Sequence, residues 1–252
     1  MAVTIKSARE IELMREAGKI LGNVHNEMED KIKSGMTAYE IDQIAEKIIR
    51  GYGCEPSFLG YQGFPGSVCI SINEEVVHGL PEKDKVVVDG DIVSLDMGVI
   101  YKGYQSDAAR TIPIGNVSEE AKRLMEVTKQ SFFVGIEQAR AGNHLFDISG
   151  AIGDYAEKFG YGVVRELVGH GIGQEMHEDP AVPNFRQRRR GMKLQAGMTL
   201  AIEPMINIGR PDIAQLNDGW TIVTDDNSLS AHYENTILIT DGEPEILSLV
   251  EK

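Results

Sequence analysis

The segment Ser94-Leu-Asp-Met-Gly-Val-Ile-Tyr-Lys-Gly-Tyr-Gln-Ser-Asp107 places two carboxylates on one predicted β-hairpin. Residues 92–97 and 104–112 are apolar strand candidates on either side of a Lys-Gly turn. With the turn centred midway between Asp96 and Asp107, the two side chains face each other at a Cβ separation of about 4.5 to 5.5 Å. Ionised carboxylates at that distance repel unless a cation lies between them. The hairpin therefore predicts a metal site, or else two solvated acids beside a surface turn.

Composition restricts the class of protein. The chain has 252 residues, of which 42% are hydrophobic, enough for a substantial core. Its net charge of -14 argues against a general affinity for DNA or for an anionic membrane. The two cysteines, Cys54 and Cys69, cannot form the disulfide framework of a small secreted protein. The first ten residues lack the apolar run of a signal peptide, and we expect a cytoplasmic protein.

Helix signals occur twice along the chain, in the same order. Ser7-x-x-Glu10 and Thr37-x-x-Glu40 are capping boxes that precede apolar residues at helical spacing. Past Pro113, Ser118 begins a third predicted helix, and a fourth starts near Phe146. Short strands are predicted at residues 67–72, 75–78 and 86–88, and longer ones at 198–203 and 231–239.

The two halves of the chain also match residue by residue at a fixed offset of 107. The matched pairs are Gly35/Gly142, Tyr39/Phe146, Glu40/Asp147, Ile41/Ile148, Gly53/Gly160, Gly90/Gly197, Leu95/Ile202 and Asp96/Glu203. A shared order of helices and strands, together with matching glycines and acids, indicates an internal repeat. We therefore expect one α+β domain over residues 1–252. Two pseudo-symmetric helix-helix-strand halves, about 1–115 and 116–252, would surround a shared antiparallel sheet.

Four acids and one histidine are the candidate ligands at the junction of these halves. Asp96 and Asp107 come from the first half, and Glu203 and Glu234 come from strand-like runs of the second. An unpaired charge in such apolar surroundings is costly, so a cation is expected. His170 lies in a glycine-rich run, Gly169-His-Gly-Ile-Gly173, where it is either a ligand or a core histidine at a turn. Four carboxylates and an imidazole suit a pair of Mn, Fe, Co or Zn ions.

In order and spacing, five segments resemble the metal-binding segments of the type I methionine aminopeptidases of bacteria. They are Ser94-Leu-Asp-Met-Gly98, Ser106-Asp107, Gly169-His-Gly-Ile-Gly173, Ala201-Ile-Glu-Pro204 and His232-Tyr-Glu-Asn-Thr236. The resemblance extends to residues 59–73 and to Val77-His78-Gly79, and so covers nearly the whole chain. It implies the two-halved "pita-bread" fold. It also implies two divalent ions bound by Asp96, Asp107, His170, Glu203 and Glu234, of which Asp107 and Glu234 bridge.

The resemblance further implies removal of the initiator methionine from nascent proteins, preferentially when the second residue is small, by a dinuclear metal-activated hydroxide. Glu203 would then carry the proton from the nucleophile to the leaving amine. His78 and His177 would contact the substrate amide and stabilise the oxyanion. The implied methionine pocket is formed by Phe58, Tyr61, Phe64, Cys69, Met176 and Trp220. At Phe58, Phe64 and Met176 the bacterial pattern more often has Cys, Tyr and Phe.

Alternatives remain for activity and partners. A peptidase of the same fold that cleaves Xaa-Pro bonds is the enzymatic rival, and a catalytically silent binding module is the rival of another class. The run Arg186-Gln-Arg-Arg-Arg190 is either a solvated loop or a transient contact with ribosomal RNA. We expect a monomer that acts on nascent chains and binds neither DNA nor a membrane.

Overall fold

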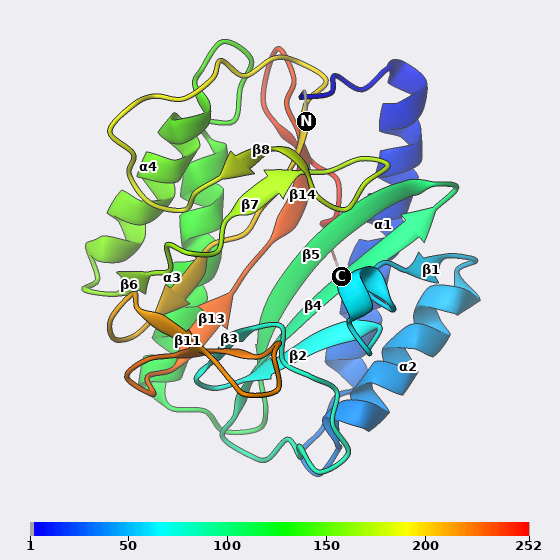
Figure 1. Ribbon diagram of the computed structural model, residues 1–252, viewed down its shortest axis with the longest axis vertical. Coiled ribbons are helices and arrows are strands. Elements are labelled where there is room, and N and C mark those ends of the chain that lie inside the picture. Colours follow the sequence, from blue (N-terminus) through cyan, green and yellow to red (C-terminus); the bar gives the residue numbers. More distant parts are fainter. Residues whose placement is uncertain (1–2, 252) are drawn as a thin grey trace.

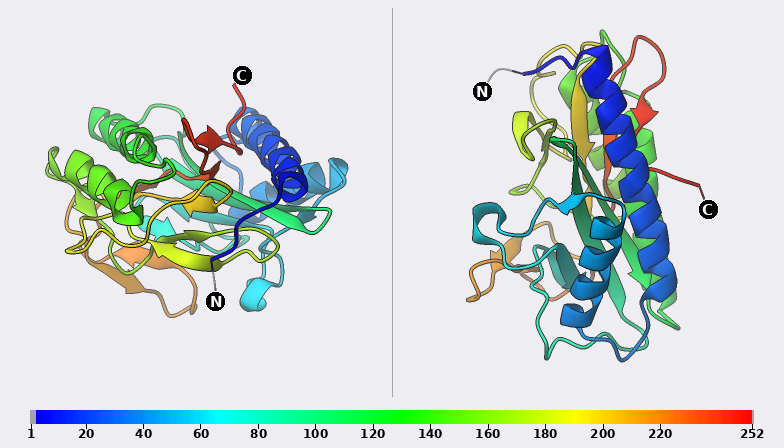
Figure 2. Two further views of the ribbon diagram at one scale, coloured as in Figure 1. Left: turned by 90° about the horizontal axis from the view of Figure 1, so that it is seen from above. Right: turned by 90° about the vertical axis from the view of Figure 1, so that its right-hand side faces the viewer.

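Four helices flank a set of short antiparallel strands and one long hairpin in residues 3–251, which this computed structural model describes (Figure 1). The helices are α1 (Ala8–Lys31), α2 (Ala38–Gly51), α3 (Glu119–Ile136) and α4 (Leu145–Glu157). In Figures 1 and 2, α1 and α2 lie on one side of the strands, and α3 and α4 lie on the other. The α+β prediction is confirmed. Within residues 3–251, no helix combines the length and the apolar character needed to cross a bilayer.

Side-chain caps set where these helices begin. Ser7 and Thr37 each accept a hydrogen bond from the backbone of the third helical residue, whose glutamate side chain bonds back, so both predicted capping boxes are present. Ser118 caps α3 as predicted. The fourth helix starts at Leu145, and Asp147 accepts a hydrogen bond from the backbone N–H of His144.

The hairpin of β4 (Ile92–Tyr101) and β5 (Tyr104–Pro113) is the longest ladder of the molecule. Lys102 and Gly103 alone form its turn, with φ angles of 49° and 82°, which is the positive-φ geometry of a tight two-residue hairpin. Tyr101 therefore pairs with Tyr104, one position later than predicted. The predicted direct opposition of Asp96 and Asp107 is wrong. Asp96 pairs with Ala109 and Asp107 with Gly98, so the two acids are diagonal neighbours on one face.

The remaining strands form small sheets around this hairpin. β1 (Glu55–Pro56) and β2 (Val68–Ile72) also pair with β4: β2 pairs with residues 93–97 and β1 with residues 99–100. The second half contributes a five-stranded sheet in the order β15 (Glu245–Ile246), β14 (Asn235–Leu238), β9 (Thr199–Ile202), β7 (Gly169–Gly171), β8 (Glu178–Val182). Two three-stranded sheets complete the set: β13 (Ser230–His232), β10 (Met205–Asn207), β6 (Gly162–Val163), and β11 (Ile213–Gln215), β12 (Ile222–Thr224), β3 (Glu75–Val77).

Two strand predictions are wrong. Residues 86–88 form no strand. Val86 makes only an isolated bridge, to Thr37 at the start of α2. The predicted strand at 231–239 is interrupted at Tyr233 and Glu234, since β13 pairs with β10 whereas β14 pairs with β9. The interruption matters for the site because Glu234 lies at the break and belongs to neither the β13–β10 ladder nor the β14–β9 ladder.

The two halves have separate hydrophobic cores. One core packs α1 and α2 against β2, β4 and β5, and the other packs α3 and α4 against β9 and β14. Elements begin at the offset of 107 found in the sequence: α2 and α4 start at 38 and 145, β1 and β6 at 55 and 162, and β4 and β9 at 92 and 199. The hairpin of the first half and the five-stranded sheet of the second meet between these cores, where β5 contacts β14.

Candidate metal centre

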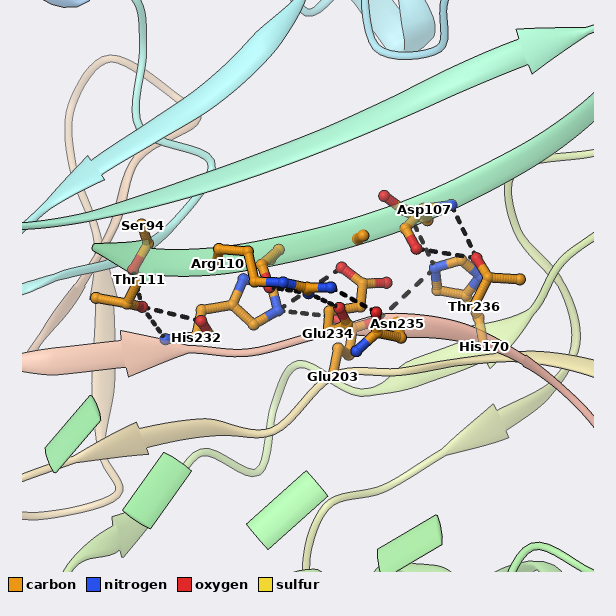
Figure 3. A network of polar contacts seen from close by, with 12 residues as sticks. Ser94, Asp107, Arg110, Thr111, His170, Glu203, His232, Glu234, Asn235 and Thr236 are labelled. Carbon is orange, nitrogen blue, oxygen red and sulfur yellow. Dashed lines mark hydrogen bonds and ion pairs between the residues drawn. The ribbon is translucent and has the colours of Figure 1, made fainter. Parts of the chain in front are cut away.

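The four predicted acids and His170 line one cavity of about 230 Å³ between the two halves. Asp96 lies on β4, Asp107 on β5, Glu203 just after β9 and Glu234 between β13 and β14. Figure 3 shows Asp107, Glu203, Glu234 and His170 around a common space beside β5. One ligand atom from each of Asp107, His170 and Glu234 lies within 4.8 Å of the others. That spacing is compatible with a shared cation.

Three of the carboxylates of this cluster have an oxygen without a hydrogen-bond donor. Among residues 3–251, one buried oxygen of Asp96, of Asp107 and of Glu234 has no partner. Burial raises the pKa of all four acids, to about 7 for Asp96. Neighbouring carboxylates raise the pKa values of Asp107, Glu203 and Glu234 further. Several buried acids without donors are stable only with protons or cations between them, and an oxygen-rich set fits divalent ions.

His170 is oriented as a metal-ligating histidine would be. Its Nδ1 lies 2.8 Å from the carbonyl oxygen of Gly171, which accepts the Nδ1–H. The unprotonated Nε2 then points into the cluster, 3.7 Å from Asp107 Oδ2 and 3.7 Å from Glu203 Oε1. Burial lowers the pKa of His170 to about 4, which keeps the imidazole neutral. A hydrogen bond on the far nitrogen is the usual way in which a ligating imidazole is held.

The two other predicted histidines, His78 and His177, line the same cavity. The Tyr61 hydroxyl lies 2.8 Å from His177 Nδ1, and the two rings stack with centroids 5.5 Å apart. The His177 ring also lies 4.2 Å from that of His170. Burial lowers the pKa of both His78 and His177, with a smaller effect of His177 on His78. Both imidazoles are therefore available as neutral hydrogen-bonding groups.

One wall of the cavity is apolar. Five of the six predicted pocket residues line it: Phe58, Tyr61, Phe64, Cys69 and Trp220. Phe64 and Trp220 meet edge to face with centroids 5.2 Å apart. The sixth, Met176, does not line the cavity but packs behind this wall in the same buried apolar cluster. Gln62 lines the cavity and had no sequence signal, since its place depends on a φ of 50° in the short helical turn at 61–63.

Cys69 is not a nucleophile in this arrangement. Burial, and then the charge of Asp96, raises the pKa of its thiol well above the ordinary value. A thiol rather than a thiolate is the result, and thiols are poor nucleophiles. The residue is a small apolar part of the wall.

Side-chain hydrogen bonds across the two halves position the ligands, and sequence reasoning missed them. Thr236 Oγ1 donates to the carbonyl of Asp107 and accepts from the N–H of Asp107, both at 2.9 Å. Arg110, buried beneath the site, donates to the carbonyl oxygen of Glu234 and, at 2.6 Å, to Asn235 Oδ1 (Figure 3). A threonine in a strand is ordinary, so only the fold reveals this role.

The basic run at 186–190 is remote from the cavity. Arg186 pairs with Asp154 and Arg190 with Asp147, and both acids are on α4. Arg188 and Arg189 are exposed.

Comparisons with known proteins find relatives over nearly the whole chain. The family model described as metallopeptidase family M24 matches residues 12–241. A methionine aminopeptidase from Clostridium acetobutylicum is 56% identical over 249 residues, which are 99% of this chain and 100% of the relative. The crystal structure of a methionine aminopeptidase from Thermotoga maritima has a TM-score of 0.96 at 42% identity, over 99% of this chain and 100% of that one. A prolidase from Pyrococcus furiosus has a TM-score of 0.80 at 25% identity, over 98% of this chain and 66% of that one.

Proposed function

Because the chain belongs to metallopeptidase family M24, we propose that it removes the N-terminal methionine from peptides and nascent proteins, preferentially when the second residue is small. It is a metallo-aminopeptidase, a hydrolase with the pita-bread fold. The observation that carries the substrate proposal is the adjacency of a buried acid cluster and an apolar pocket in one cavity.

We propose two divalent ions, drawn from Co, Mn, Fe and Zn, held by Asp96, Asp107, His170, Glu203 and Glu234. Asp107 comes from the first half and Glu234 from the second, so both halves would hold the ions. Bound ions supply Lewis-acid chemistry, which lowers the pKa of a water toward neutrality and polarises the first peptide carbonyl. The unpartnered oxygens of Asp96, Asp107 and Glu234 support this assignment.

We propose roles in peptide hydrolysis for three protein groups around the cluster, Glu203, His78 and His177. Glu203 takes the proton from the attacking water and passes it to the leaving amine, a role that its place in the cavity beside the other carboxylates supports. In this proposal the Tyr61 hydroxyl, 2.8 Å from His177 Nδ1, acts as the donor, so that Nε2 of His177 would carry the proton and be free to donate to a substrate. His78 and His177 then donate to the substrate amide and to the developing oxyanion. These roles are assignments from geometry and from the family resemblance.

The apolar wall selects the first side chain. A methionine thioether is flexible and polarizable, and it packs well against the edges of aromatic rings. Phe58, Phe64 and Trp220 offer such edges beside the cluster. A free α-amine would lie next to the carboxylates, which confines cleavage to the N-terminal residue.

One assay tests this proposal against its enzymatic rival. Chelator-treated protein is supplied with each of Co, Mn, Fe and Zn and is offered Met-Ala-Ser, Met-Leu-Ser and Ala-Pro-Ala. We expect release of methionine from Met-Ala-Ser, much slower release from Met-Leu-Ser, and no cleavage of Ala-Pro-Ala. Preferential cleavage of Ala-Pro-Ala would instead support an Xaa-Pro peptidase, the activity suggested by the structural likeness to a prolidase. Absence of hydrolysis with every metal and every peptide would favour a binding module.

We also propose that residues 1–115 and 116–252 are related halves of one catalytic domain. The offset of 107 shared by helix and strand starts supports this relation. So does the delivery of two carboxylates by each half to one cluster.

A further inference from the structure

His232 is a buried imidazole beside the cluster that has no assigned role. It ends β13 and is 1% exposed. Its Nε2 lies 3.9 Å from Glu203 Oε2 and 3.9 Å from Glu234 Oε2. Neither distance is a hydrogen bond, and no other residue between 3 and 251 bonds to either of its ring nitrogens. A polar group so deeply buried without a partner is costly and rare, so a functional explanation is required.

The backbone of His232 is fixed to the hairpin that holds Asp96 and Asp107. The Thr111 hydroxyl donates to the carbonyl of His232 and accepts from its N–H, both at 2.9 Å. Because that hydroxyl has one proton, the Ser94 hydroxyl 2.8 Å away must donate to it. All three hydrogen-bonding positions of the Thr111 hydroxyl are thus occupied, two by the backbone of His232 and one by Ser94, and Figure 3 shows this series of bonds from Ser94 to His232.

Thr111 of the first half thus bonds both backbone groups of His232 in the second half. In the same way, Thr236 of the second half bonds both backbone groups of Asp107 in the first. Between the two threonines, Ala109 and Glu234 form a backbone pair, with N–H to O distances of 3.4 and 3.0 Å. Thr111 lies four residues after Asp107, and Thr236 lies four residues after His232. His232 therefore occupies, on the second half, the place that Asp107 occupies on the first, and both point to the face that carries Glu234.

The Glu203 carboxylate lies between two imidazoles. Its Oε1 is 3.7 Å from His170 Nε2, and its Oε2 is 3.9 Å from His232 Nε2. A neutral imidazole has one N–H, whereas a carboxylate only accepts hydrogen bonds. With His170 presenting its unprotonated Nε2, the proton-bearing Nε2 of His232 would act on the opposite oxygen of Glu203.

We propose that His232 is a positioning residue of the metal centre: its Nε2–H is directed at the Glu203 and Glu234 carboxylates and orients Glu203 relative to His170. This inference rests on the proposed role of Glu203. His232 acts on the reaction through Glu203 and does not touch the substrate.

A matched pair of variants tests this role. His232→Gln keeps an N–H donor near the position of Nε2, and His232→Leu fills a similar volume without one. We expect His232→Leu to lower kcat and Co²⁺ affinity at least about tenfold with KM little changed, as for other groups that orient metal ligands. His232→Gln should recover most of both losses. Equal behaviour of the two variants, or a Co²⁺ affinity of His232→Leu within twofold of wild type, would overturn the proposal.

A measurement on the wild-type protein makes the test independent of whether His232→Leu folds. Histidine ¹⁵N resonances of the zinc-loaded protein, assigned with His232→Gln, report which nitrogen of His232 carries the proton. We expect Nε2–H; a protonated Nδ1, or an Nε2 bound to the metal, would contradict the inference.

His170→Gln separates the proposed role of His232 from the proposed metal centre. If it leaves Co²⁺ affinity unchanged, the proposed metal centre fails; if it weakens binding and His232→Leu does not, only the role of His232 fails.

Discussion

The two halves deliver their carboxylates to the cavity by different means. In the first half, Asp96 and Asp107 are 11 residues apart on one continuous ladder closed by a two-residue turn. In the second, Glu203 and Glu234 are 31 residues apart and lie just outside the ends of short strands. The ladder fixes the first pair, and Thr236 of the second half also bonds Asp107. The second pair lies outside the strands, where Arg110 of the first half donates to the carbonyl oxygen of Glu234. One rigid hairpin is therefore enough to organise the metal centre, because contacts between the halves hold the residues of the second half against it.

The largest expected effect comes from removing one of the proposed metal-binding carboxylates from either half. Asp107→Asn and Glu234→Gln should each lower kcat/KM for Met-Ala-Ser more than about a hundredfold, because changes that only orient a ligand already cost about 10- to 100-fold. Steady-state kinetics in excess Mn²⁺ measures this, with Glu119→Gln on the exposed start of α3 as control. Near wild-type activity in one variant but not the other would show that a single half carries the centre.

Removing the ions should destabilise the fold, and more so at higher pH. Burial raises the pKa values of the four acids, so the ion-free folded protein keeps protons that the unfolded chain releases above about pH 4. As pH rises through that window, the ion-free protein loses stability, whereas ions bind better because they compete with fewer protons. At one hundred times Kd an ion adds about 2.7 kcal/mol, or roughly 5 to 10 °C in Tm for a chain of this size. Calorimetry with and without chelator at pH 6 and pH 8 checks this; a difference that shrinks with pH would contradict it.

The threonine contacts across the halves should contribute similarly on the two sides. Thr236→Val removes the hydroxyl that bonds both backbone groups of Asp107, and Thr111→Val does the same for His232. Each variant leaves buried polar groups unpaired, at an expected cost of about 1 to 3 kcal/mol in the free energy of unfolding. Urea unfolding of both variants measures this cost. A change below about 0.5 kcal/mol, the level of an ordinary surface substitution, would show that the contact does not hold the halves together.

The smallest effects are expected in the basic run of the second half, at residues 186–190. Arg186→Ala and Arg190→Ala each remove an exposed ion pair to α4 and should cost less than about 1 kcal/mol. Arg188→Glu with Arg189→Glu changes only exposed charge and should leave stability unchanged. Cosedimentation with ribosomes then separates the two interpretations of this run. We expect no change for a solvated loop, and loss of association would indicate contact with ribosomal RNA.

Local signals in the sequence predicted much of this molecule. The capping residues Ser7, Thr37 and Ser118 act within one turn of helix, and the structure confirms them. The hairpin was predicted as well, but not its register, because the register depends on which two residues take positive φ at Lys102-Gly103. A shift of one position changed the two acids from direct to diagonal neighbours.

Contacts between distant residues could not be predicted in the same way. The strand expected at 231–239 has the right composition, yet it exchanges partners between β10 and β9 at Tyr233. Thr111, Thr236 and His232 owe their roles to the meeting of β5 with the second half. Met176 has the apolar character of a pocket residue, and only packing puts it behind the wall.

The most direct test of a centre shared by both halves is a titration of chelator-treated protein with Mn²⁺ in which ion binding and Met-Ala-Ser hydrolysis are followed together. A shared centre should give no hydrolysis without ion, activity that rises with ion occupancy, and weakened ion binding in both Asp107→Asn and Glu234→Gln. Undiminished hydrolysis in excess chelator, or unchanged Mn²⁺ binding in either variant, would contradict it.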